Sequence, residues 1–166
     1  MKSIKFVSIL ACILLLSGCV APLSNQDLIK EFDNTNFTIT ETERGLVVYL
    51  PLVFFEFGSV DLTLAAREKL EETSEILTRL STKSRQLSIE GHTDDIGDAQ
   101  YNLELSKERA SNVLEILAFS GVSRDRMVAL GLGESKPARP NYNEDGSTNE
   151  ANRAKNRRVE LIILNI

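Results

Sequence analysis

The chain has 166 residues, a formal net charge of −5, no Trp, two Cys and one His. This length fits a single domain, and the acidic balance excludes a general nucleic-acid binder, which carries a basic stripe. Two cysteines are too few for a disulfide framework or a zinc site of paired CxxC motifs. Because any catalytic triad would have to use His92, an enzyme is the disfavoured class. We expect no cofactor and no metal.

The first eighteen residues have the pattern of an export signal. Lys2 and Lys5 precede an apolar run over residues 6–16, which is well short of the roughly 20 residues that a bilayer-spanning helix needs. The segment ends in Leu16-Ser17-Gly18-Cys19, which resembles the lipobox of bacterial lipoprotein precursors. The resemblance implies that residues 1–18 are a signal peptide and that Cys19 carries the acyl chains, such as palmitate.

The residue after the cysteine bears on the destination of the lipoprotein. In lipoproteins of this kind, an Asp directly after the acylated Cys is an inner-membrane retention signal, and this chain has Val20 there. The resemblance therefore implies an outer-membrane, lipid-anchored protein that faces the periplasm. Three acyl chains exceed the two signals that stable membrane attachment requires.

A polar segment and then a compact domain are expected after the anchor. Residues 19–44 are predicted to be the lipidated N-terminus and a linker, with a short helix over 26–32 and an edge strand over 38–42. Residues 45–166 are predicted to form the domain. Its expected elements are a strand over 46–57 broken by Pro51, a helix over 65–80, a strand over 86–92, a helix over 101–119, a strand over 127–132, a polar loop over 134–155 and a strand over 158–166.

This order predicts an α+β sandwich in which helices pack on one face of a mixed sheet. The second helix is expected to face the core with Leu103, Ala110, Leu114 and Leu117, and to end at Gly121. The first helix is expected to begin near Asp61 or Thr63.

The second helix also carries a polar stripe. Asn102, Ser106, Arg109 and Val113 are spaced four, three and four residues apart, so they share one face. Asp94 lies in the loop before this helix. If the loop folds back over the stripe, Asp94 and Arg109 face one small cavity. That pair suits a zwitterion, because the carboxylate takes an ammonium group and the guanidinium holds a carboxylate through two parallel hydrogen bonds.

The run Asn102-x-x-Leu105-Ser106-x-x-Arg109-Ala110-x-x-Val113-x-x-x-Leu117, preceded by Gly91-His92-Thr93-Asp94, resembles the peptidoglycan-binding motif of OmpA C-terminal-like domains. These domains occur in outer-membrane porin tails, peptidoglycan-associated lipoproteins and flagellar stator subunits. The similarity extends over residues 54–161 and implies the OmpA-like β-α-β-α-β-β fold.

The resemblance also implies a ligand and the residues that hold it. The ligand is the diaminopimelate side chain of the peptidoglycan stem peptide, bound by Asp94 and Arg109. Asn102 and backbone amides near Thr93 help to shape the pocket, and a basic residue at the start of the last strand, Arg157 or Arg158, lies nearby. One departure is Gly58, which stands where many members have Asp or Asn, with Ser59 as a substitute.

Simpler interpretations of the same residues stay open. Asp94 and Arg109 can form a surface salt bridge. Asp94, Asp95 and Asp98 suggest a cation site but lack the ligand pattern of a calcium loop. His92 beside Asp94 resembles a catalytic base and the residue that orients it, although a structural histidine at a strand end is the favoured interpretation. The basic residues at 153, 155, 157 and 158 fit an anionic wall polymer or a solvated strand entry.

Two functions are consistent with these observations. The first is a structural tether, in which lipid at Cys19 holds the outer membrane and the domain binds peptidoglycan noncovalently. The alternative is a regulatory lipoprotein that sequesters a periplasmic or outer-membrane protein partner and uses wall binding for positioning. A surface for such a partner leaves no readable signature in the sequence.

Overall fold

The computed structural model describes residues 23–32, 35, 37–56, 59–79, 82 and 84–165, except for the side chain of Val53. The elements are α1 (Asn25–Phe32), β1 (Thr38–Thr42), β2 (Gly45–Pro51), the 3-10 turn η2 (Leu52–Phe54), α2 (Leu64–Thr78), β3 (Leu87–His92), α3 (Ala99–Phe119), the 3-10 turn η3 (Arg124–Arg126), β4 (Met127–Gly131), α4 (Glu150–Asn156) and β5 (Arg158–Leu164). The predicted signal peptide, the predicted lipidation site Cys19, and Gly58 lie outside the described residues. Among the described helices, none has the length and apolar character needed to span a membrane.

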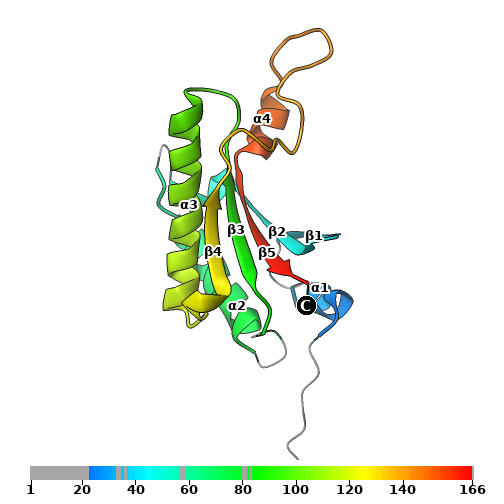
Figure 1. Cartoon of the computed structure of the whole chain (residues 1–166), viewed down its shortest axis with the longest axis vertical. Helices are drawn as coiled ribbons and strands as arrows, with labels where there is room; N and C mark the ends of the chain where they lie inside the picture. Colours follow the sequence, from blue (N-terminus) through cyan, green and yellow to red (C-terminus); the bar gives the residue numbers. More distant parts are fainter. Residues whose placement is uncertain are drawn as a thin grey trace, which may run out of the picture.

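The described strands form one mixed sheet in the order β1-β2-β5-β3-β4 (Figure 1). Strands β3 and β4 run parallel, and the other neighbours are antiparallel. From residue 45 onward, the predicted order of strand, helix, strand, helix, strand and strand is present. The seven-residue helix α4, which was expected to be part of a polar loop, is added before β5.

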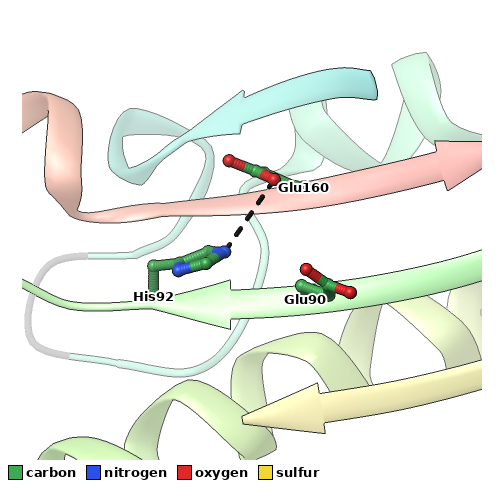
Figure 2. A group of neighbouring side chains, drawn as sticks. All are labelled: Glu90, His92 and Glu160. Carbon is green, nitrogen blue, oxygen red and sulfur yellow. Dashed lines mark ion pairs between the residues drawn. The ribbon is translucent and has the colours of Figure 1, made fainter. Parts of the chain in front are cut away.

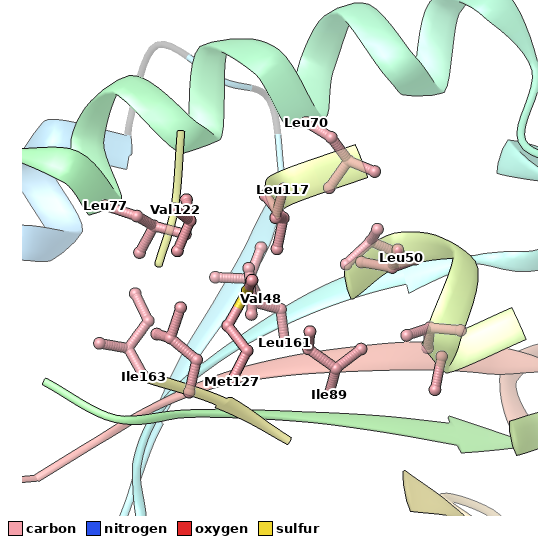
Figure 3. Packing of buried hydrophobic residues seen from close by; sticks show 14 of the residues in the cluster. Val48, Leu50, Leu70, Leu77, Ile89, Leu117, Val122, Met127, Leu161 and Ile163 are labelled. Carbon is pink, nitrogen blue, oxygen red and sulfur yellow. The ribbon is translucent and has the colours of Figure 1, made fainter. Parts of the chain in front are cut away.

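The apolar core lies between the sheet and helices α2 and α3. Figure 3 shows Leu70 and Leu77 of α2 and Leu117 of α3 facing Ile89 of β3 and Leu161 of β5. These five side chains are fully or almost fully buried. Burial of a Leu or Ile side chain contributes about 1.5–3 kcal/mol, so this layer holds the helices on the sheet.

Helix α3 approaches the sheet closely because β3 and β4 each have a glycine at or next to their last residue. A Cβ atom added at Gly91 would lie 1.9 Å from the Ser106 carbonyl oxygen, and one at Gly131 would lie 2.5 Å from the Leu103 carbonyl oxygen. Side chains at these positions would push α3 away from β3 and β4. The glycines thus fix the distance between the helix that carries Arg109 and the strand that leads to Asp94.

Both ends of α3 are stabilised locally. The Asp98 carboxylate accepts hydrogen bonds from the backbone N–H groups of Gln100 and Tyr101, which makes Asp98 the N-cap. Gly121, at φ +98°, ends the helix as predicted, and the Val122 N–H donates to the Leu117 carbonyl. Helix α2 begins after Thr63, whose hydroxyl accepts from the Ala66 N–H.

Two sequence-based expectations differ from the structure. Residues 25–42 are not a linker: α1 places Leu28 and Phe32 in the main core, and β1 pairs with β2 along its whole length. The predicted edge strand at 38–42 is present, and the domain therefore begins before residue 45. Leu103 is 41% exposed, because the glycines draw the neighbouring face of α3, with Asn102 and Ser106, against the sheet.

Candidate functional site

The loop between β3 and α3 presents Thr93 and Asp94, and hydrogen bonds fix its course. The Thr93 N–H donates to the Gly133 carbonyl oxygen at 2.9 Å. One oxygen of the Asp94 carboxylate accepts from the Ile96 N–H at 3.2 Å. This arrangement leaves the Thr93 amide engaged within the protein, while its buried hydroxyl has no hydrogen-bond partner among the described residues.

Asn102, in the first turn of α3, ties this loop to the helix. Its side-chain amide donates to the carbonyl oxygens of Asp94 at 3.4 Å and Ile96 at 3.1 Å, and to a Glu134 carboxylate oxygen at 2.8 Å. The side chain is buried. Because its donors are occupied by the protein, Asn102 positions Asp94.

Asp94 pairs with Arg157, which lies between α4 and β5. The Arg157 Nη1 atom is 2.5 Å from Asp94 Oδ2, and Nη2 is 2.8 Å from a Glu150 oxygen. Burial would lower the pKa of Arg157, but hydrogen bonds to Asp94 and Glu150 outweigh it and raise that pKa. A carboxylate offers about four acceptor positions, and the hydrogen bonds from the Ile96 N–H and Arg157 leave the Asp94 carboxylate with spare positions for a ligand donor.

Arg109 lies deeper, on the face of α3 that meets the sheet. It is 7% exposed, its guanidinium carbon is 5.4 Å from the centre of the Phe55 ring, and Nη2 donates to the Ser59 carbonyl oxygen at 3.3 Å. Its buried Nε has no hydrogen-bond partner among the described residues. Burial lowers the pKa of Arg109, while the negative charge of Asp94 acts in the opposite direction. Among the described residues, the Ser59 carbonyl oxygen is the one hydrogen-bond acceptor of the Arg109 guanidinium, so most of its N–H donors remain for a ligand.

The structure brings Asp94, Arg109, Asn102, Thr93 and Arg157 together around the N-terminal half of α3. Asp94 forms its ion pair with Arg157 and not with Arg109, so the alternative interpretation of the two motif residues as a salt bridge is wrong. The Asp94 carboxylate and the buried Arg109 guanidinium thus lie in one site without an ion pair between them, and each has unused hydrogen-bonding positions toward the described residues. That arrangement can hold a small zwitterion by its two ends.

Sequence reasoning left Arg157 and Arg158 as alternatives, and the structure separates them. Arg157 reaches Asp94, whereas the Arg158 guanidinium binds Glu160 at 2.7 Å on β5. The arginines of the basic cluster are thus paired with carboxylates, since Arg153 also binds Asp95 at 2.9 Å. This pairing favours a structural role for the cluster over contact with an anionic polymer.

Three contact residues of the site were missed: Phe55, Glu134 and Glu150. The aromatic residues within 54–57 contribute to the family resemblance. An aromatic ring in this segment could have been predicted to pack against the Arg109 guanidinium. Glu134 and Glu150 belong to a polar stretch without periodicity, so nothing in the sequence distinguishes them from other exposed acids.

His92 does not contact Asp94, so the base-and-orienter interpretation is wrong. Its side chain lies between β3 and β5, with Nε2 4.0 Å from a Glu160 oxygen (Figure 2). Burial lowers the pKa of His92 to about 4, and the positive charge of Arg158 acts in the same direction. Within the described residues, metal-ligating atoms gather at Glu90, His92 and Glu160, and not at the aspartates of loop 94–98.

Comparison with known proteins identifies the family to which the domain belongs. A model of the OmpA family matches residues 54–155. A peptidoglycan-associated lipoprotein from Legionella pneumophila is 37% identical over 106 residues, which cover 64% of this chain and 57% of that protein. The chain spans between 15% and 49% of the length of other curated relatives.

Solved structures agree with this match. A MotB-like protein from Desulfovibrio vulgaris superposes with a TM-score of 0.70 at 26% identity, covering 85% of this chain and 91% of that one. The peptidoglycan-associated lipoprotein from Burkholderia pseudomallei gives a TM-score of 0.57 at 27% identity, covering 80% and 98%. The predicted α+β class, with helices on a mixed sheet, is confirmed.

The matched region exceeds half of the chain, so the chain belongs to the OmpA family, a class of non-enzymatic peptidoglycan-binding domains of the bacterial cell envelope. Within that family, it is similar to the peptidoglycan-associated lipoproteins. The expectation that the protein is not an enzyme follows from this membership.

Proposed function

We propose that the protein is an outer-membrane lipoprotein that binds peptidoglycan noncovalently, through the diaminopimelate of the stem peptide, and so tethers the outer membrane to the cell wall. The observation that carries the proposal is that the Asp94 carboxylate and the buried, incompletely satisfied guanidinium of Arg109 lie in one site without pairing with each other. Membership of the OmpA family and the names of the lipoprotein relatives support it.

The chemistry of the ligand matches the two groups. The free end of a diaminopimelate side chain carries both an ammonium and a carboxylate. Asp94 accepts the ammonium with its spare lone pairs, and Arg109 donates two parallel hydrogen bonds to the carboxylate. Asn102, Thr93 and Arg157 hold the loop and the Asp94 carboxylate in place, and Glu134 anchors Asn102.

The membrane contact is assigned to lipid on Cys19. The support for this assignment is the lipobox-like sequence at 16–19, the signal-like residues 1–18, and the similarity of the domain to lipoproteins. Covalent acylation with more than one chain gives stable membrane attachment.

The ligand assignment predicts that the wild-type protein distinguishes two stem peptides. A soluble peptide that contains diaminopimelate is expected to bind about tenfold or more tightly than the same peptide with Lys, because Lys lacks the carboxylate that Arg109 would bind. Isothermal titration calorimetry measures both affinities. Equal affinities would show that the site does not recognise the zwitterion.

A second prediction separates the anchor from the domain. Cys19→Ser is expected to yield a periplasmic protein that is released without detergent and still binds isolated sacculi, because attachment and recognition lie in different segments. Cell fractionation and co-sedimentation with sacculi measure the two properties. Loss of sacculus binding in this variant would mean that lipid makes the wall contact.

A further inference from the structure

The face of the sheet opposite α2 and α3 carries three metal-ligating side chains at close range. Glu90 of β3 lies directly opposite Glu160 of β5 in the strand register, and His92 follows Glu90 by two residues on the same face. The ligand atoms of these three residues all lie within 4.8 Å of one another. Figure 2 shows the three side chains between β3 and β5. Neighbouring strands of one sheet hold them, so the positions are rigid.

His92 supplies an observation independent of the two acids. The side chain is 2% exposed, and neither ring nitrogen has a hydrogen-bond partner among the described residues. The Lys136 carbonyl is near enough to favour a protonated ring, but no hydrogen bond of good geometry joins them. Both ring nitrogens therefore lie unpartnered among the described residues, and one of them is within 4.8 Å of the ligand atoms of the two carboxylates. A buried imidazole without partners is costly unless something binds it.

The two carboxylates require positive charge, because like charges directly opposite one another destabilise a sheet. Arg44 binds both oxygens of Glu90, and its positive charge also attracts Glu160. Burial would raise the pKa of Glu90, but the hydrogen bonds from Arg44 and Ser88 hold it below its usual value. These hydrogen bonds hold the Glu90 carboxylate in place on β3.

The two arginines beside the acids differ in burial and in their number of contacts. The Arg44 side chain is 49% exposed and sits at the turn between β1 and β2. Arg158 is buried, and its guanidinium also donates to the carbonyl oxygens of Asn156 and Lys136. Arg44 can therefore leave the carboxylates by a side-chain rotation, while Arg158 stays in place.

We propose that Glu90, His92 and Glu160 form a binding site for Zn²⁺, and that Arg44 competes with the metal for the carboxylates. One imidazole and two carboxylates are a ligand set that zinc accepts, with water in the fourth position. Magnesium and calcium prefer oxygen ligands only and more of them. This site departs from the sequence-based expectation of no metal, because its ligands come from two strands that are distant in the chain. It is independent of the proposed peptidoglycan site.

Zinc titrations of four variants test the proposal. The full chain is purified at neutral pH without a histidine tag, and every variant carries Cys12→Ser and Cys19→Ser to remove thiols. Zinc is expected to raise the melting temperature of the parent chain, and His92→Gln and Glu160→Gln are each expected to abolish the increase. Arg44→Gln is expected to raise the zinc affinity about tenfold or more, because it removes the charge-assisted hydrogen bonds of the competitor.

A second arginine–glutamate pair in the chain provides the matched control. Arg124 binds Glu115 on the surface. The one histidine of the chain, His92, lies with Glu90 and Glu160, so this pair has no histidine beside it. Arg124→Gln should leave the zinc affinity unchanged. Zinc should also shift the single set of imidazole NMR resonances, and magnesium should not. A zinc effect that persists in His92→Gln, or one that Arg44→Gln leaves unchanged, would overturn the proposal.

Discussion

Asp94→Asn is expected to weaken binding of a diaminopimelate-containing stem peptide by about 30- to 5,000-fold. The amide keeps the size of the carboxylate but only one acceptor oxygen, so it can serve the Ile96 N–H or Arg157 but not both. The Asn102 amide still donates to the carbonyl oxygens of Asp94 and Ile96, so the loop keeps its course. The ligand ammonium, however, loses its counter-charge in a largely buried site. Removing one partner of a buried, hydrogen-bonded charge pair costs about 2–5 kcal/mol, and each 1.4 kcal/mol is a factor of ten.

Asp95→Asn is the matched control for this variant. Asp95 is the next residue and is also paired with an arginine, Arg153, but among the described residues no hydrogen bond or ion pair joins its side chain to Asp94, Arg109 or Asn102. Its affinity for the peptide is expected to stay within about twofold of the parent value. Calorimetry gives both affinities, and thermal melting checks the fold. Similar losses in both variants would indicate a general charge effect, and a large fall in the melting temperature of Asp94→Asn would favour a structural role.

Arg109→Lys is expected to reduce the affinity for the same peptide by about 10- to 150-fold, while Lys keeps the formal charge. A guanidinium presents parallel donors that match both oxygens of a carboxylate, whereas an ammonium is a compact charge on a flexible stem. Loss of one charge-assisted hydrogen bond costs about 1.5–3 kcal/mol. Burial of the position, against Phe55, also disfavours a charged lysine.

The peptide with Lys in place of diaminopimelate distinguishes the causes of this loss. If Arg109 binds the ligand carboxylate, Arg109→Lys should weaken the diaminopimelate peptide much more than the lysine peptide, so the two affinities converge. An equal loss for both peptides would instead mean that Arg109 supports the shape of the site. Unchanged binding of the diaminopimelate peptide would exclude the two-ended recognition of the ligand.

Much of the fold was predictable because its elements have strong local signals. Thr63 and Gly121 mark helix boundaries by capping chemistry, and β5 carries Val159, Leu161 and Ile163 at alternate positions, so these elements were located correctly. Helix α4 was missed because its seven residues are nearly all polar, and only Asn156 is buried. The packing of α1 was missed because two apolar residues, Leu28 and Phe32, give too weak a pattern to indicate core contact.

The sequence predicted which residues lie close together around Asp94, but not which of them contact one another. Helical spacing placed Asn102 and Arg109 on one face, which is correct, but their partners depend on how distant segments pack. The choice between Arg157 and Arg158 rests on where the chain leaves α4 and enters β5. The pairing of Asp94 with Arg157, and of Asn102 with Glu134, is tertiary information that neither spacing nor composition contains.

The docking of α1 onto the domain sets a short distance between membrane and domain. If Cys19 carries lipid, five residues separate it from the first residue of α1, Asn25, and the six residue-to-residue steps span about 20 Å at most when fully extended. Helix α1 lies at the end of the sheet opposite the loop between β3 and α3 (Figure 1). The protein would therefore act as a spacer of nearly fixed height, with Asp94 directed away from the lipid surface and toward the layer it contacts.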